Sequence, residues 1–264
     1  MTEDLTITII QAPLRWEDQP GNLANFGGLM RPLQGIQDLI LLPEMFNTGF
    51  SMNPPLYAEP MDGPSIAWLM EQAAFTGSVI AATLMIVEDG SYFNRSVWVY
   101  PDGTLGYYDK RHLFRMGNEG EHFSKGGTKR IFRVKGWKIM PLTCYDLRFP
   151  VWSMNSYAGE EYRYDLLYYL SNWPAARTFH WRSLLTARAI ENQAYVAGVN
   201  RTGKDGHGLD HSGHSLMLDP WGNILADAGE AETFLLKTTL SHHKLTDYRK
   251  KFFIAPDWSD DTEE

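Results

Sequence analysis

The chain has 264 residues, of which 44% are hydrophobic, and this is enough to bury a large core within one domain. Its formal net charge of −8 argues against nucleic acid as a partner, because proteins that bind a phosphate backbone present clustered lysine and arginine. No run approaches the about 18 consecutive apolar residues that span a bilayer, and the acidic start is unlike a secretory signal. The composition therefore predicts a cytoplasmic protein without a membrane partner, whose ligands are small molecules.

No internal repeat or long linker divides the chain, so we predict a single domain over 1–264 with a disordered charged tail at 259–264. Apolar runs bounded by turn residues predict strands at 5–11, 38–42, 79–87, 94–100, 104–108, 137–143, 164–170, 195–200, 215–219 and 233–239. Helical spacing predicts helices between the first two strands, at 65–75, at 181–192 and at 241–251. Strands that alternate with helices indicate an α/β fold with mixed sheets covered by helices.

Polar residues follow three of the predicted apolar strands, namely Glu44, Cys144 and Asn172. In sheets covered by helices, ligands commonly bind at the carboxyl ends of the strands, so these side chains are candidates for a site. Cys144 is the only cysteine, and it cannot form an internal disulfide. A free cysteine is most often a small buried hydrophobic residue, but this position also suits a nucleophile.

The other candidate groups are ambiguous when each is taken alone. Glu44 is either a capping or ion-paired carboxylate or a desolvated carboxylate at the rim of the core that acts as a base. Lys110 is either an ordinary solvated lysine or a catalytic one. The histidines His207, His211 and His214 do not have the spacing of zinc ligands beside cysteines. We interpret them as loop and strand residues and predict no metal.

Three local segments occur in order and at fitting distances, and together they are specific: LLPEMF at 41–46, YDKRHL at 108–113 and CYDLRFP at 144–150. In these segments the chain resembles the carbon–nitrogen hydrolase, or nitrilase, superfamily, whose members use a Glu-Lys-Cys triad. The resemblance continues through NWP at 172–174, RAIENQ at 188–193 and GHSLMLDPWG at 213–222. It implies a four-layer α-β-β-α sandwich and a homodimer or larger assembly in which sheets extend across the subunit contact.

The resemblance also implies a mechanism that needs no metal or organic cofactor. Glu44 accepts the thiol proton, Cys144 attacks an amide carbon, and Lys110 with the backbone N–H of Tyr145 stabilises the oxyanion. Ammonia leaves, and water then hydrolyses the thioester.

Family members carry a second active-site glutamate between the lysine and the cysteine. Glu119 is the better match, and Glu121 is the competing assignment, because both precede the His-Phe pair at 122–123.

The residues after the cysteine resemble those of the ω-amidase branch, and the segment around Asn172 looks most like bacterial ω-amidases. These enzymes hydrolyse the terminal amide of α-ketoglutaramate or α-ketosuccinamate. Arg148 is predicted to bind the carboxylate of such a substrate, because guanidinium matches carboxylate geometry; the alternative is an ion pair with Asp146 that braces the loop. We also expect Asn172, Trp173 and Phe46, which belong to the matching segments, to contact the substrate. The alternatives are a deaminated-glutathione amidase, another carbon–nitrogen hydrolase or a catalytically idle interaction protein.

Overall fold

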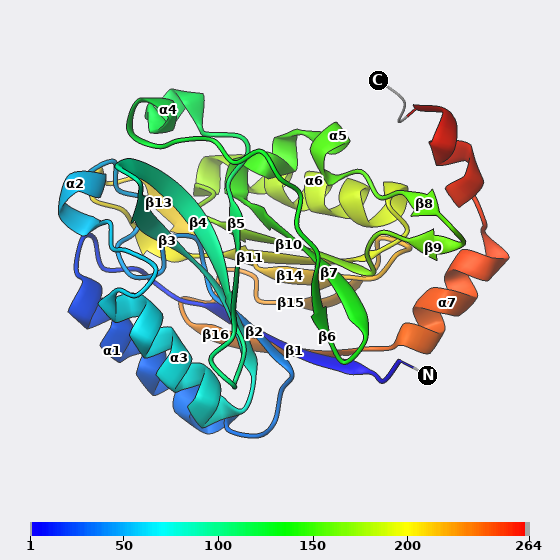
Figure 1. The fold of residues 1–264 in the computed structure, drawn as a ribbon, viewed down its shortest axis with the longest axis horizontal. Helices are drawn as coiled ribbons and strands as arrows, with labels where there is room; N and C mark the ends of the chain where they lie inside the picture. The colour runs from blue at the N-terminus through cyan, green and yellow to red at the C-terminus, as the bar shows by residue number, and fades with distance from the viewer. Residues whose placement is uncertain (1, 262–264) are drawn as a thin grey trace.

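The computed structural model describes residues 2–261 and contains two six-stranded sheets (Figure 1). The first sheet has the order β16-β1-β2-β3-β4-β5. Its strands are β1 Leu5–Gln11, β2 Leu39–Leu41, β3 Val79–Glu88, β4 Ser91–Val99, β5 Leu105–Asp109 and β16 Phe234–Leu240. The second sheet has the order β15-β14-β11-β10-β7-β6. Its strands are β6 Phe132–Val134, β7 Trp137–Thr143, β10 Leu166–Ser171, β11 Tyr195–Asn200, β14 Leu216–Leu218 and β15 Ile224–Asp227. Two small hairpins pair β8 Tyr157–Ala158 with β9 Glu161–Tyr162, and β12 Thr202–Lys204 with β13 Asp210–Ser212.

The helices are mostly short and lie outside the sheets (Figure 1). The α-helices are α1 Gln19–Met30, α2 Pro54–Tyr57, α3 Pro64–Thr76, α4 Glu119–His122, α5 Pro150–Ser153, α6 Thr178–Glu191 and α7 His242–Lys251. The 3₁₀ turns are η1 Arg31–Leu33, η2 Arg115–Gly117, η3 Cys144–Arg148, η4 Ala175–Arg177 and η5 Ala255–Asp261. Over 2–261, no helix has the length and apolar character needed to cross a membrane. Of the predicted disordered tail, 262–264 lie outside the described residues.

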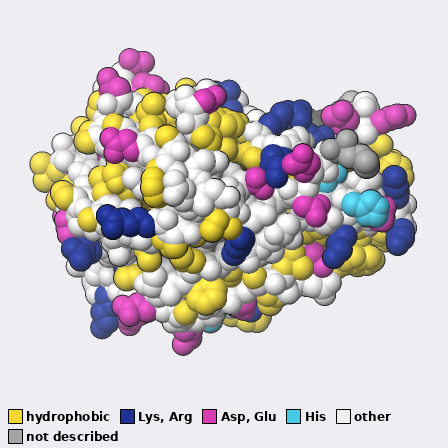
Figure 2. Space-filling view, turned by 90° about the horizontal axis from the view of Figure 1, so that it is seen from below, with side chains coloured by type: hydrophobic (Ala, Val, Ile, Leu, Met, Phe, Trp, Pro, Cys, Tyr) yellow, Lys and Arg dark blue, Asp and Glu magenta, His cyan; other side chains and the backbone are white. Residues whose placement is uncertain are grey.

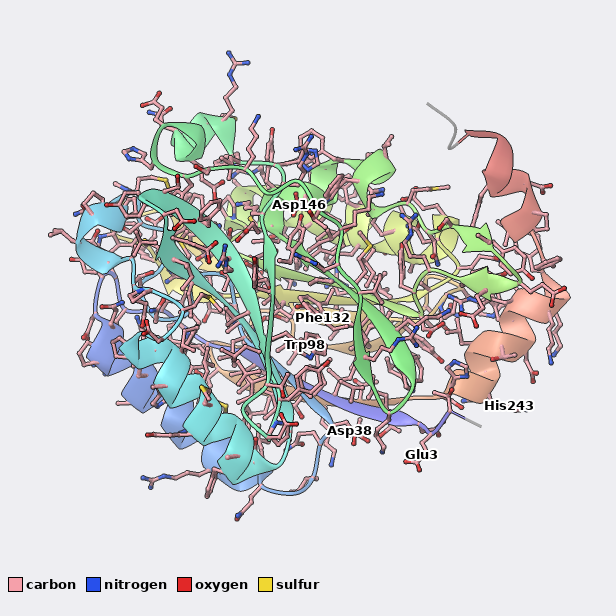
Figure 3. All side chains as sticks on the ribbon, in the orientation of Figure 1. Glu3, Asp38, Trp98, Phe132, Asp146 and His243 are labelled. Atoms are coloured by element: carbon pink, nitrogen blue, oxygen red, sulfur yellow. The ribbon has the colours of Figure 1, made fainter. Side chains whose placement is uncertain are left out.

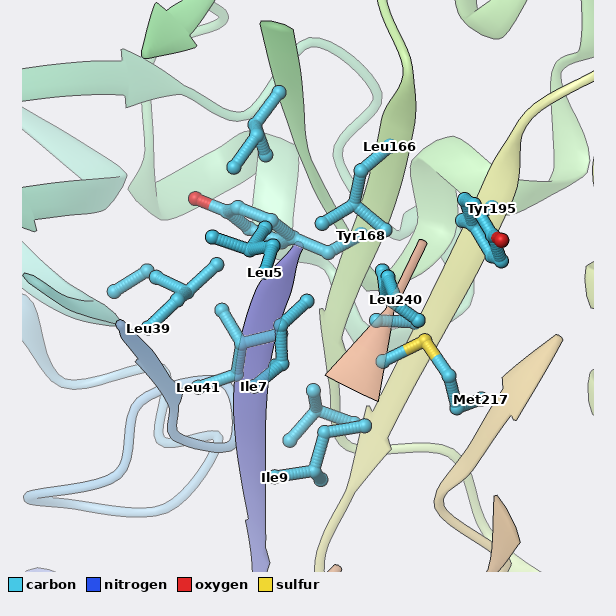
Figure 4. Close-up of a cluster of buried hydrophobic side chains, with 14 of the residues drawn as sticks. Leu5, Ile7, Ile9, Leu39, Leu41, Leu166, Tyr168, Tyr195, Met217 and Leu240 are labelled. Carbon is cyan, nitrogen blue, oxygen red and sulfur yellow. The ribbon is translucent and has the colours of Figure 1, made fainter. Parts of the chain in front are cut away.

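Three hydrophobic clusters separate four layers of structure. One lies between the sheets and includes Ile7 and Leu41 from the first sheet with Tyr168 and Met217 from the second (Figure 4). A second cluster joins the outer face of the first sheet to helices α1 and α3, and a third joins the outer face of the second sheet to α6. The predicted α-β-β-α sandwich is therefore confirmed.

Strand β10 illustrates why the central strands have continuous apolar sequences. Its residues Leu166, Tyr168 and Leu170 face the other sheet, whereas Leu167 and Tyr169 face the helix layer. Side chains alternate between the faces of a strand, so a strand that is covered on both sides must be apolar throughout. Nearer the sheet edge, Trp98 of β4 stacks on Phe132 of β6 with ring centroids 4.9 Å apart, and this contact closes the inter-sheet core (Figure 3).

Parallel pairing in the middle of both sheets brings the catalytic candidates to one end of the sandwich. Strand β2 is parallel to β1 and β3, and β10 is parallel to β7 and β11. Glu44 follows β2, Cys144 follows β7, and Asn172 follows β10. The backbone N–H of Asn172 donates to Glu44 Oε2 at 3.0 Å, so the carboxyl ends of the two sheets meet at the site.

The predicted strands at 5–11 and 137–143 coincide with β1 and β7. Short elements such as β6, β15, α4 and α5 were not predicted, because they have too few residues to show a period.

On the face seen in Figure 2, lysine and arginine side chains are dispersed among acidic ones, an arrangement unlike the basic stripe of a nucleic-acid binder.

Candidate active site

Cys144 occupies a strained turn directly after β7. It begins η3 with a φ of +45°, a value that non-glycine residues rarely adopt. Asp146 holds this turn, since its Oδ2 accepts a hydrogen bond from the backbone N–H of Thr143 at 3.1 Å. The geometry presents the thiol at the end of a buried strand, and the side chain is only 9% exposed.

Asp146 ties the cysteine turn to the segment that carries Lys110. Its carboxylate accepts hydrogen bonds from the Tyr108 hydroxyl at 2.7 Å and from the His112 backbone N–H at 2.9 Å (Asp146 in Figure 3). The His112 ring also lies 2.8 Å from this carboxylate through Nδ1. Asp146 is thus engaged by the loop and by the lysine segment, so Arg148 does not brace the loop through it.

Lys110 lies between two buried carboxylates. Its Nζ is 2.9 Å from Glu44 Oε1 and 2.9 Å from Glu119 Oε2, and all three side chains are fully buried. Glu119 is held in turn by the backbone N–H of Phe114, which donates to Oε2 at 2.5 Å. Glu121 is exposed on α4, so the structure brings Glu119, and not Glu121, to Lys110.

Two asparagines complete the surroundings of Glu44. Asn94 Nδ2 donates to Glu44 Oε1 at 2.8 Å and to Glu119 Oε1 at 2.9 Å, and Asn172 Nδ2 donates to the Glu44 carbonyl at 2.6 Å. Sequence reasoning missed Asn94. A signal was present, because Asn94 has the same parity as Ser96 and Trp98, and it therefore places an amide on the inner face of β4.

Burial and charge determine the protonation states in this cluster. Burial opposes the charge on Lys110, but the carboxylates of Glu119 and Glu44 outweigh it and raise the pKa of the ammonium. Burial, and then the charge of Glu44, raise the pKa of the Cys144 thiol well above its usual range, against the opposing effect of Lys110. Burial also raises the pKa of Glu119. The resting site therefore holds a charged lysine and a neutral thiol, so the thiol needs a proton acceptor when it attacks.

A cavity of about 270 Å³ opens onto the thiol. Cys144 and Asn172 line it, whereas Lys110 and the two glutamates lie behind this lining. The remaining lining residues are aromatic, apolar or charged: Phe50, Phe114, Met116, Tyr145, Arg148, Trp173, Pro174, Arg177, Asp205, Leu209 and His211. Arg177 was not identified from the sequence. The volume falls at the small end of the range for ligand pockets, which suits a short substrate.

The substrate-binding residues predicted from the sequence do not all reach this cavity. Arg148, Asn172 and Trp173 line it, and the indole of Trp173 also donates to the Cys144 carbonyl at 3.4 Å. Phe46 does not: its ring is fully buried between α1 and α3 and stacks on Trp68 with centroids 5.7 Å apart. The assignment of Phe46 to substrate contact is therefore corrected to a core position.

The histidine group predicted to be structural is spread over different surroundings. His211 lines the cavity, and its Nδ1 donates to the Leu209 carbonyl oxygen, 3.0 Å away, whereas His207 is exposed. Across residues 2–261, no cluster of three or more histidine, cysteine, aspartate or glutamate side chains is arranged to hold a metal ion.

A strand-end thiol backed by a buried carboxylate and ammonium defines a cysteine-dependent hydrolase site. Residues 6–250 match the carbon–nitrogen hydrolase family. The chain is 45% identical over 258 residues to omega-amidase YafV of Escherichia coli K12, covering 97% of this chain and 96% of that protein. It is 34% identical over 198 residues to 2-oxoglutaramate amidase of Bacillus subtilis, covering 74% and 75%. The chain belongs to the carbon–nitrogen hydrolase family.

Solved structures share the fold. The carbon–nitrogen hydrolase superfamily protein XC1258 of Xanthomonas campestris superposes with a TM-score of 0.94 at 43% identity, covering 96% of this chain and 97% of that one. Nit3 of Saccharomyces cerevisiae, a nitrilase superfamily member, gives a TM-score of 0.82 at 25% identity, covering 94% of each chain. The protein is thus an amide-hydrolysing enzyme with the nitrilase fold.

Proposed function

We propose that this enzyme hydrolyses the terminal amide of an ω-amido α-keto acid, α-ketoglutaramate or α-ketosuccinamate, and releases ammonia. One observation carries the proposal: a single small cavity brings the Cys144 thiol together with the Arg148 guanidinium. The thiol supplies the nucleophile for the amide end, and the guanidinium suits the carboxylate at the other end. The 45% identity to an enzyme named omega-amidase and the 34% identity to a 2-oxoglutaramate amidase support the same substrate class.

Acylation begins from the neutral thiol. Glu44 accepts the proton from Sγ as the sulfur bonds to the amide carbon, and the carbonyl electron pair moves to oxygen. The Lys110 ammonium and the backbone N–H of Tyr145 stabilise this oxyanion; Tyr145 lies in the first turn of η3, where N–H groups have no partner within the helix. The carbon–nitrogen bond then breaks as Glu44 returns the proton to nitrogen, and ammonia leaves.

Deacylation uses the same groups with water. Glu44 accepts a proton from water, whose oxygen adds to the thioester carbon, and the carbon–sulfur bond breaks as Glu44 returns the proton to Sγ. The acid product leaves. Glu119 keeps Lys110 in place through two hydrogen bonds, of 3.0 and 2.9 Å, and Asn94 bridges Glu44 and Glu119. Water is the only second reactant, and the steps call for no cofactor.

A related structure supports the reactivity of a cysteine at this place. XC1258, which is 43% identical to this chain, is described with an arsenic adduct in its active site. Thiols are ligands that bind arsenic readily. A cavity of about 270 Å³ also favours a short keto acid over the dipeptide tail of deaminated glutathione.

The test is a panel assayed for ammonia release: α-ketoglutaramate, α-ketosuccinamate, deaminated glutathione, a nitrile and a carbamoyl compound. We expect the two keto-acid amides to have the highest kcat/KM. A higher kcat/KM for deaminated glutathione would show that the enzyme is a deaminated-glutathione amidase instead. Activity that disappears with a chelator and returns with metal would contradict the cofactor-free mechanism.

We also propose that the enzyme assembles as a homodimer or a larger homo-oligomer. Val151 of α5 is 84% exposed and Phe179 of α6 is 80% exposed, and large exposed apolar side chains suit a subunit contact. Light scattering should give at least twice the chain mass of 30.1 kDa. Introducing aspartate at Val151 and Phe179 should shift that mass toward the monomer, and a native monomer at working concentration would contradict the proposal.

A further inference from the structure

Arg177 is a second guanidinium in the cavity that contains the thiol. It ends η4, directly before α6, and its side chain is half-buried. The guanidinium carbon lies 5.5 Å from the centre of the Phe114 ring, which also lines the cavity. The nucleophile, Arg148 and Arg177 therefore share one small space.

The Arg177 guanidinium has no hydrogen-bond or ion-pair partner among residues 2–261, apart from the contact of its face with the Phe114 ring. The four strongly buried guanidiniums, by contrast, each have carboxylate or backbone carbonyl partners: Arg95 has Glu88 and Asp109, Arg188 has Glu191 and Leu147, Arg201 has Leu14, Thr202 and Lys204, and Arg249 has Asp165, Gln193 and Tyr164. Arg188 Nε and Arg201 Nη1 also lack a partner, but a half-buried guanidinium with no hydrogen-bond or ion-pair partner at all needs a different explanation from these structural ones.

Arg148 has no carboxylate partner over the same residues either. Its Nη2 lies 3.1 Å from His180 Nδ1, and its guanidinium carbon lies 4.7 Å from the centre of a Trp173 ring. Both arginines line the same small cavity, and burial lowers the pKa of Arg177; Cys144 opposes this effect, whereas the positive charge of Arg148 adds to it. Arg177 is also the N-cap of α6, where the helix dipole disfavours positive charge.

Asp205 is the one carboxylate among the residues that line the cavity. Its Oδ1 accepts hydrogen bonds from the backbone N–H groups of His207 and Leu209, both at 2.9 Å. Its negative charge also opposes the lowering of the Arg201 pKa by burial. His211 is neutral above a pKa of about 4, because burial and then Arg201 disfavour its charged form. The two arginines therefore give this part of the cavity an excess positive charge that calls for an anion.

We propose that Arg177 is a specificity-determining residue that, together with Arg148, binds the carboxylate of the substrate while the amide lies at Cys144. A carboxylate has two oxygens with about four acceptor positions, so it can receive hydrogen bonds from both guanidiniums. Its charge replaces the repulsion between them with two attractions. The inference rests on the proposed function and adds the feature by which the enzyme selects amides that carry a carboxylate.

Three five-carbon amides isolate this contact. α-Ketoglutaramate and glutaramate both have the carboxylate, and pentanamide has neither the carboxylate nor the keto group. Arg177→Gln is expected to lower kcat/KM by about 10- to 100-fold for the first two, the range for loss of charge-assisted hydrogen bonds, and by less than about twofold for pentanamide. Arg182→Gln is the matched control, because Arg182 lies on α6 and pairs with Asp227, 2.7 Å away, outside the cavity lining. It should leave all three values unchanged.

A binding measurement keeps this test independent of turnover. Pentanoate should slow the alkylation of Cys144 by iodoacetamide in the native enzyme, and about tenfold more pentanoate should be needed in Arg177→Gln. If no amide is hydrolysed but this difference holds, the proposed function fails and the anion site stands. Thermal stability should not fall in Arg177→Gln, since the side chain braces nothing.

Four results would overturn the inference: equal losses on pentanamide and the charged amides, no loss on any of them, a loss confined to α-ketoglutaramate, or identical protection by pentanoate in both proteins. The first would make Arg177 a supporting residue of the nucleophile. The third would assign it to the keto oxygen.

Discussion

The charged residues behind the Cys144 thiol and those in front of it are satisfied in different ways. Behind it, Lys110 is fully buried and hydrogen-bonded to Glu44 and Glu119 at 2.9 to 3.0 Å. In front of it, Arg148 and Arg177 line the cavity without a carboxylate partner among residues 2–261. The inner group is complete before any ligand binds, and the outer group is completed by an anion.

This difference separates chemistry from recognition. A preorganised inner cluster stabilises the charge that develops at the reacting amide, and it serves any amide that reaches the thiol. The unpaired outer guanidiniums act on a part of the substrate that does not react, so they decide which amide arrives. Substitutions in the inner group should therefore affect all substrates equally, and substitutions in the outer group should affect charged substrates alone.

The largest expected effect is that of Cys144→Ala. Removing the only thiol of the chain should abolish ammonia release from every amide, a loss on the order of 10⁶ as for nucleophiles in other hydrolases. Mass spectrometry of quenched turnover mixtures should detect an acyl adduct on the native enzyme and none on the variant. Circular dichroism should show that the variant is folded. Substantial turnover by this variant would eliminate the thioester mechanism.

Next comes Lys110→Met, which leaves two buried carboxylates without their cation. We expect kcat to fall by about 10²- to 10³-fold with charged and uncharged amides alike, because an oxyanion donor is lost. Breaking a buried ion pair should also lower the free energy of unfolding by about 3–5 kcal/mol, so denaturant titration must accompany the kinetics.

The control for that loss of stability is Arg249→Met. Arg249 forms another buried pair, 2.7 Å from Asp165, and Asp165 precedes β10 whereas Asn172 follows it, so this pair lies at the opposite end of the strand from the site. Arg249→Met should lower stability by a similar amount and leave kcat unchanged in the folded protein. A similar fall in kcat for both variants would mean that Lys110 acts through stability alone.

The inner group could be anticipated from the sequence, because Glu44, Lys110 and Cys144 each lie in a contiguous segment that resembles a motif of the carbon–nitrogen hydrolase superfamily. The strands themselves were predictable where the apolar run is long, as in β1 and β7. Asn94 was not anticipated, since its importance depends on β4 placing an amide beside Glu44, which is 50 residues away along the chain. The alternation along β4 predicts that Asn94 lies on the inner face, but only the folded structure shows that Glu44 lies beside it.

The corrected position of Phe46 has a local physical cause. Phe46 was expected to contact the substrate because it belongs to the same matching segment, 41–46, as Glu44. However, Met45 has a φ of +46°, which turns the chain between them and directs Phe46 into the core under α1 and α3. Arg177 was missed for another reason: an arginine before a helix looks like an ordinary surface residue, and its unused donors become visible only in the folded cavity.

Arg148→Lys tests the outer group with an intermediate effect. Lysine keeps the charge but loses the two parallel hydrogen bonds of the guanidinium, so kcat/KM for α-ketoglutaramate should fall by about 10- to 150-fold. The value for pentanamide should stay within about twofold. His180→Ala is the control. It removes the contact between His180 Nδ1 and Arg148 Nη2, 3.1 Å apart, and leaves the guanidinium free to bind the substrate, so it should change neither kcat/KM value. Equal losses on charged and uncharged amides would return Arg148 to a bracing role.

The smallest effect on turnover is expected for His211. Because its ring is neutral at pH 7, it adds no third positive charge to those of Arg148 and Arg177 in the cavity. Burial, and then the charge of Arg201, lower the pKa of His211 from 6.5 to about 4. At about 1.4 kcal/mol per pH unit, this shift changes the free energy of unfolding by about 3 kcal/mol. Between these two pH values the unfolded chain binds a proton at His211 and the folded chain does not. Stability from this residue is therefore fully present above pH 6.5 and is lost as the pH falls toward 4.

The measurement is the free energy of unfolding in urea at pH 7 and pH 4.5, compared between the native protein and His211→Asn. Other groups titrate in both proteins, so the difference between their losses isolates His211, and the native protein should lose about 2–3 kcal/mol more. His243→Asn, whose side chain is 83% exposed, should behave like the native protein. At pH 7 all three should have the same kcat/KM, because His211 is already neutral. If the native protein and His211→Asn lose equal stability, His211 titrates normally, and the cavity would then bind carboxylates through three cations below pH 6.5 in place of two.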